Sequence, residues 1–157
     1  MSEEQNKERN GLSSVVQIEA LADQLSAIAD EIHARVMKDI KDHKGGPISE
    51  AEQAIARGLL EDEVLLRQRA DGLYADAATY VVQSLGQSQQ VIVKLTVDAA
   101  EKIRKISRLA DITGLAGGVL ALAGAVATGQ AAPIVVAIER VSKQVKRVAA
   151  STPRKTA

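Results

Sequence analysis

The chain has 157 residues, contains no Phe, Trp or Cys and only two Tyr, and draws its apolar residues almost entirely from Ala, Val, Leu and Ile. The lack of Cys excludes disulfides and thiolate chemistry, and the near absence of large aromatic side chains favours thin helical packing over a thick globule. The net charge is zero, but it changes from −7 over residues 1–64 through +2 over 65–111 to +5 over 112–157, so the basic end can meet an anionic surface.

The N-terminal region predicts a polar tail followed by an amphipathic helix. Residues 1–12 are polar and charged, so we expect a disordered tail, no secretory signal and a cytoplasmic protein. Residues 13–44 place apolar side chains three and four positions apart, which is the spacing of one helix face. These side chains are Ile18, Leu21, Leu25, Ile28, Ile32, Val36 and Ile40. The helix is expected to end at the Gly-Gly-Pro sequence of residues 45–47.

A second, much longer helix is predicted over residues 49–110. Ser49 and Glu52 have the spacing of a capping box, which marks a helix start. From Leu60 onward a 4-3 spacing continues for about seven heptads, which is typical of a coiled coil. The predicted seam contains Leu60, Val64, Arg67, Asp71, Tyr74, Ala78, Val81, Leu85, Ser88, Ile92, Leu95, Ala99, Lys102, Ile106 and Leu109. Residues 13–110 thus predict a long helical hairpin, and the Gln-, Ser- and Gly-rich residues 83–90 mark the place for a bend.

Three glycines recur at intervals of 14 residues along this second helix, at Gly58, Gly72 and Gly86. Each weakens a helix by about 0.5–1 kcal/mol relative to Ala. One interpretation is chance or gentle bending of the helix. The other is a lane along which a second helix approaches closely.

The most informative segment is the run of 27 residues without a charge, 112–138. Gly129, Gln130 and Pro133 divide it, so residues 111–150 predict a Gly/Ala-rich apolar helical hairpin with helices over 112–127 and 133–148. The spacing of Gly114 and Gly118 allows close helix approach, as in membrane helix dimers. The predicted membrane or helix contact consists of Gly114, Gly118, Ala121, Leu122 and Ala125. The same segment also suits the buried central helix of a soluble bundle, and the sequence leaves both interpretations open.

Basic residues flank the apolar segment on both sides. The last helix carries Arg140, Lys143, Lys146 and Arg147, which we predict to contact an anionic surface. Positive charge on both flanks favours a shallow hairpin whose two ends stay at the inner face of a membrane. It argues against a single span. Residues 151–157 predict a short mobile tail.

Few residues could carry out chemistry. His33 and His43 lie ten residues apart and do not share a helix face, and Asp39 with His43 offers two metal ligands without a third. The acidic run of residues 61–63 is typical of a solvated face. We therefore expect no catalytic residues, no metal, no cofactor and no enzyme. The neutral net charge and scarce aromatics also argue against nucleic-acid binding.

These patterns predict an all-α, non-enzymatic protein that associates with membranes, self-assembles, or does both through its apolar segment. The expected partners are further copies of the chain and either an anionic membrane surface or another helical protein. The order of long helices and an apolar hairpin resembles the layout of α-helical pore-forming proteins, without a shared motif. Two alternatives remain: a soluble coiled-coil adaptor or oligomeric scaffold, and a coat protein of granules or lipid droplets.

Overall fold

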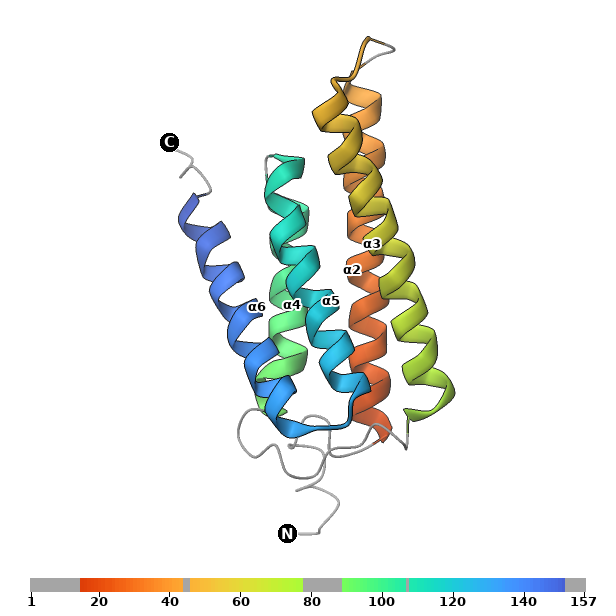
Figure 1. Cartoon of the computed structure of the whole chain (residues 1–157), viewed down its shortest axis with the longest axis vertical. Helices are drawn as coiled ribbons and strands as arrows, with labels where there is room; N and C mark the ends of the chain where they lie inside the picture. The colour runs from red at the N-terminus through yellow and green to blue at the C-terminus, as the bar shows by residue number, and fades with distance from the viewer. Residues whose placement is uncertain (1–14, 44–45, 78–88, 107, 152–157) are drawn as a thin grey trace.

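The computed structural model describes residues 15–43, 46–77, 89–106 and 108–151 (Figure 1). All helices and turns described below lie within these ranges, in which no strand occurs. The helices are α2 (Val15–Asp42), α3 (Glu50–Ala75), α4 (Gln89–Lys105), the short 3-10 helix η4 (Leu109–Asp111), α5 (Ile112–Ala127) and α6 (Ala131–Ser151). The predicted all-α class is confirmed.

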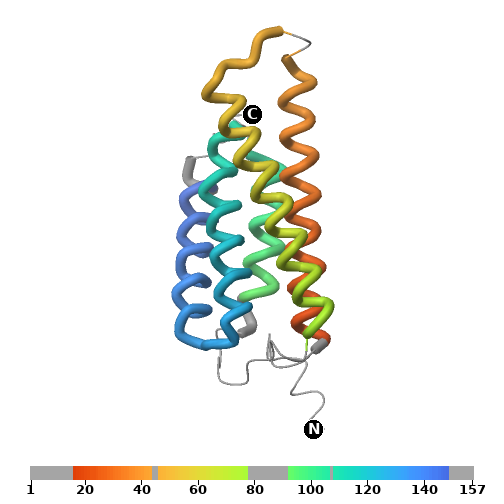
Figure 2. Tube along the Cα trace, turned by 45° about the vertical axis from the view of Figure 1, so that its right-hand side comes forward, coloured from red at the N-terminus to blue at the C-terminus, as the bar shows by residue number. Residues whose placement is uncertain are grey.

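The helices form an upright bundle in which the chain direction alternates. In the view of Figure 1, α2 runs upward, α3 downward, α4 upward, α5 downward and α6 upward. Helix α2 packs on α3 and α4, α5 packs on α3 and α6, and α6 also packs on α4. Figure 2 shows the same grouping after a rotation, with α6 and α3 on opposite sides of α5.

The inner face of α2 is the one that the sequence predicts. Six of its seven apolar positions, Ile18, Leu21, Leu25, Ile28, Ile32 and Val36, are fully buried. The seventh, Ile40, is 40% exposed because it lies in the last turn, near the loop to α3. Helix α3 then begins with the predicted cap, since the backbone N–H of Glu52 donates to Oγ of Ser49 at 3.2 Å.

The apolar seam predicted for the first part of the second helix lies on the wrong face of α3. The buried side chains of α3 are Leu59, Leu66, Ala70 and Leu73. Val64 and Tyr74, which the predicted seam contains, are 54% and 42% exposed. Arg67 lies at the rim of the α2 contact, where it donates to Asp30 at 2.8 Å. Side chains one or two positions away from the predicted seam face α2 and α5, and this choice of face depends on the tertiary partners.

A single second helix over residues 49–110 is also wrong. Helix α3 ends at Ala75, and Asp76 leaves the helical conformation with φ −141° and ψ 43°. Helix α4 begins at Gln89 and packs along α2. A 62-residue helix would be about 93 Å long and would extend far beyond the 28 residues of α2, about 42 Å. Folding back lets Ile92, Ala99 and Ile103 bury their side chains. Gly86 and most of the predicted bend lie outside the described residues.

His43 joins the end of α2 to the start of α3. Its Nδ1 donates to the backbone oxygen of Asp39 at 2.8 Å, and its Nε2 lies 2.8 Å from Oε2 of Glu52. The hydrogen bond to Asp39, and then the contact with Glu52, raise the pKa of His43 above 6.5. The charged imidazole therefore stabilises the fold fully below pH 6.5 and loses this effect as the pH rises through the folded-state pKa.

We expect the free energy of unfolding to be slightly lower at pH 8 than at pH 6, because His43 loses its proton as the pH rises through its raised pKa. The effect is small because the imidazole and the Glu52 side chain are 27% and 49% exposed, and solvent screens them. Urea unfolding at both pH values measures it. In His43→Gln this part of the pH dependence should disappear, and a variant with an unchanged pH profile would contradict the assignment.

Candidate functional site

Helix α5 occupies the position of a core helix. Its buried residues are Ile112, Leu115, Ala116, Gly118, Val119, Leu122, Ala123, Ala125 and Val126. Among the described residues one helical stretch, Leu109–Ala127, is long and apolar enough to cross a membrane, and 56% of its most apolar window is buried. Length and composition alone are weak support for a span, because a core helix of a soluble bundle meets the same criteria.

The five predicted contact residues of α5 do not form one exposed strip. Gly118, Leu122 and Ala125 are buried, Ala121 is half-buried and Gly114 is exposed. The glycines face α6 of the same chain. A Cβ atom at Gly118 would lie 3.6 Å from Cγ2 of Val141, and one at Gly114 would lie 3.1 Å from Oε1 of Gln144. The close helix approach that the glycines allow is thus used within the chain, between α5 and α6.

Helix α6 separates an apolar face from a basic one. Ile134, Ala137, Ile138, Val141 and Val148 are buried against the bundle. The four predicted cations, Arg140, Lys143, Lys146 and Arg147, are all exposed. None of the four makes an ion pair with any residue that the structure describes, and Glu139 is the one acidic residue of α6.

The basic face of α6 borders a shallow groove of about 290 Å³. The groove is lined by Val136, Glu139, Arg140, Lys143, Gln144 and Arg147. Val136 is 65% exposed at the beginning of this face, so an apolar side chain lies beside the cations. Val136 and Gln144 were not predicted from the sequence, because their positions in the groove depend on how α6 is rotated against α5. We call Val136, Arg140, Lys143, Lys146 and Arg147 the α6 contact face.

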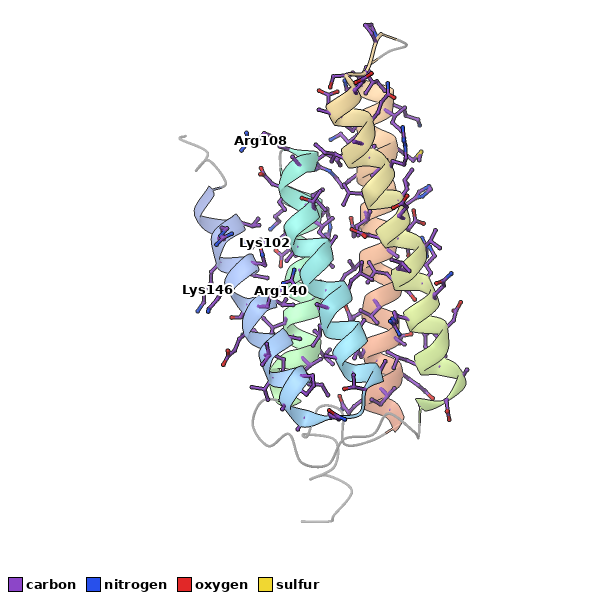
Figure 3. The ribbon with its side chains drawn as sticks, viewed as in Figure 1. Lys102, Arg108, Arg140 and Lys146 are labelled. Carbon is purple, nitrogen blue, oxygen red and sulfur yellow. The ribbon has the colours of Figure 1, made fainter. Side chains whose placement is uncertain are left out.

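Charge is divided between the two sides of the bundle. Helices α2 and α3 together carry 12 acidic and 6 basic side chains, a net charge of −6. Helices α4 and α6 carry 3 acidic and 8 basic side chains, a net charge of +5. Figure 3 shows Lys102 of α4 with Arg140 and Lys146 of α6 on the side of the bundle away from α3. This side therefore attracts anions as a whole.

The basic residues that precede the apolar segment are less available than those of α6. Arg104 contacts Glu31 at 3.3 Å, Lys105 contacts Glu101 at 2.7 Å, and Arg108 contacts Asp111 at 3.2 Å. Lys102 is half-buried. The cations of α6 are therefore better placed for an external partner.

The described residues contain no group of three side chains that could hold a metal ion. The two histidines lie in separate polar contacts, His33 with Glu63 at 2.8 Å and His43 with Glu52. No family model matches the chain, and no curated protein and no solved structure matches it.

Proposed function

We propose that this protein is a non-enzymatic helical bundle that binds reversibly to an anionic membrane surface through the α6 contact face. The observation that carries this proposal is the set of four exposed cations without an ion pair among the described residues. They lie on an edge helix whose other face is anchored in the core. The natural site for such binding is the cytoplasmic leaflet, where anionic lipids give a negative surface potential.

Magnitudes support reversible surface binding. Each Lys or Arg near an anionic surface contributes about 1 kcal/mol, so four contribute about 4 kcal/mol before the repulsion of Glu139 is subtracted. Val136 adds a small apolar contribution on entering the headgroup region. In this proposal α5 remains in the core, because its transfer into lipid would require the bundle to open.

The burial of α5 favours a second candidate, a soluble helical adaptor that binds no lipid. In that case α5 is only the central helix of the bundle, and the cations of α6 contact an acidic protein. The two candidates differ in their response to lipid composition.

The test compares two variants that remove the same charge from opposite sides of the bundle. In the first, Lys143, Lys146 and Arg147 of α6 become Gln. In the control, three exposed cations of α2 and α3 become Gln, namely Lys38, Lys41 and Arg69. We expect wild type and control to float with vesicles of phosphatidylcholine and phosphatidylserine, and neither to float with phosphatidylcholine alone. The α6 variant should lose about 3 kcal/mol of membrane-binding free energy, which lowers its partition coefficient by up to roughly 10²-fold.

High salt should release the wild-type protein, because screening weakens attraction between exposed charges. If wild type does not float with anionic vesicles, the proposal fails and the adaptor is favoured. Equal losses in the two variants would show that overall charge, and not the α6 contact face, governs binding.

A further inference from the structure

Helix α3 has an outward face that no described part of the chain covers. The residues along it repeat at intervals of three and four, which is the period of a helix–helix seam. They are Ala51, Ala54, Gly58, Glu61, Leu65, Gln68, Gly72 and Ala75, and all except the half-buried Gly58 are exposed. We call these eight residues the α3 outer seam.

Two observations set this seam apart from an ordinary solvated face. First, Leu65 and its neighbour Val64 are 47% and 54% exposed at the centre of the seam. Their adjacent side chains form an apolar patch that is exposed to water. Second, a Cβ atom at Gly58 or Gly72 would meet no described residue within 4 Å, and neither glycine has a positive φ. Packing within the described part of the chain therefore does not require these glycines, although glycine weakens a helix relative to alanine.

We propose that two copies of the chain pair through the α3 outer seam, with the two α3 helices antiparallel. With the two-fold axis at the centre of the seam, Leu65 of each copy packs on Glu61 of the other. The exposed Val64 side chains meet at the axis. Gly58 lies opposite Gln68, and Ala54 lies opposite Gly72, so the backbones approach to about 8 Å between axes.

Charge complementarity selects the antiparallel pairing. Arg57 and Asp71 flank the seam on the side of Val64 and are both exposed. In the antiparallel pair Arg57 of each copy lies beside Asp71 of the other, which gives two ion pairs. A parallel pair would instead place Glu61 against Glu61 in the seam, where like charges repel.

Helices α3 and α6, which carry the α3 outer seam and the α6 contact face, lie on opposite sides of the bundle (Figure 1). Pairing through α3 therefore goes beyond membrane binding and does not depend on it. One pair of helices with small side chains buries less than the roughly 1,200–2,000 Å² of stable interfaces, so we expect a dimer with a dissociation constant in the micromolar range.

Sedimentation equilibrium of the full chain from low to high micromolar concentration tests the dimer. We expect Gly58→Leu and Gly72→Leu to raise the dissociation constant at least about tenfold, because larger side chains keep the helices apart. Both should stay folded, since each glycine faces open space. Gly124→Leu on α5 is the matched control, because a Cβ atom there also meets no described residue within 4 Å. It should leave the dimer intact.

A charge exchange tests the antiparallel pairing. Arg57→Asp alone and Asp71→Arg alone should each raise the dissociation constant about tenfold, because each turns two attractive contacts into repulsive ones. The double variant should restore wild-type association. Failure of the double variant to recover would overturn the pairing of Arg57 with Asp71.

Cross-linking locates the two-fold axis, since the chain has no cysteine of its own. Val64→Cys should cross-link to a second copy with a short bismaleimide. Ala34→Cys, exposed on α2, is the control and should react only at the rate of random collisions. A strictly monomeric wild type at high micromolar concentration would overturn the proposal, as would equal cross-linking of the two variants. Neither result would affect the vesicle test of α6.

Discussion

We expect Leu122→Arg to abolish the folded state. Leu122 is fully buried in α5. Loss of a buried Leu side chain costs about 2–5 kcal/mol, and a buried cation without a partner adds several kcal/mol more. The sum reaches the 5–15 kcal/mol by which domains of this kind are stable. Circular dichroism and urea unfolding of the purified variant measure the outcome.

The control for this experiment is Val97→Arg, which places the same new side chain at an apolar residue that is 43% exposed in α4 and lies outside both the α3 outer seam and the α6 contact face. It should keep the helical spectrum and melt close to wild type, because its guanidinium stays in water. A Leu122→Arg protein that is folded with wild-type stability would contradict the position of α5 in the core. It would favour instead a peripheral α5 that is free to contact lipid.

We expect the effect of a substitution at Gly118 on the free energy of unfolding to depend strongly on the size of the new side chain. Gly118→Ala should raise the free energy of unfolding by about 0.5–1 kcal/mol, because its Cβ would make an ordinary contact with Val141 at 3.6 Å. Gly118→Leu should lower it by about 1–3 kcal/mol or more, because the backbone of Val141 lies just beyond and cannot give way. Urea unfolding of both variants measures the two values.

Gly124, in the last turn of α5, provides the comparison. A Cβ atom there would meet none of the described residues within 4 Å, so Gly124→Ala and Gly124→Leu should both be tolerated. If Leu were tolerated equally well at Gly118 and Gly124, the close approach of α5 to α6 would be wrong. The contrast therefore measures the α5–α6 contact itself.

Features set by local sequence were predictable. The predicted first helix over 13–44 corresponds to α2, Val15–Asp42, because a glycine pair and a proline follow it directly. Helix α5 has the expected bounds, Ile112–Ala127, and the cap of α3 is Ser49 as expected. Each of these depends on residues within one or two turns, which is the range of capping and breaking signals.

Features set by tertiary partners were not predictable. The 4-3 spacing through residues 60–74 fits two neighbouring stripes of α3 almost equally well, and contact with α2 and α5 selects the stripe of Leu59, Leu66 and Leu73. The spacing also continues beyond Ala75 in the sequence, although α3 ends there. A periodic pattern predicts that a helix has an apolar face, but it does not predict which element covers that face.

The candidate site also contains some features that could be predicted from the sequence and others that could not. The four cations of α6 were predictable, because a basic amphipathic pattern fixes their common exposure. The pairing of Arg104 with Glu31, from helices far apart in the sequence, was not. The contact of Gly118 with α6 was not predictable either, since its small-residue spacing suits a lipid-embedded dimer as well as an intramolecular contact.

The separation of acidic α2 and α3 from basic α4 and α6 makes the bundle an electric dipole, although its net charge is zero. Near a negatively charged surface such a dipole rotates until its basic pole faces that surface. This torque acts over about one Debye length, roughly 10 Å at 0.1 M salt, so alignment precedes contact. The molecule then arrives with one preferred orientation, and its acidic pole, which includes α3, points back into solution.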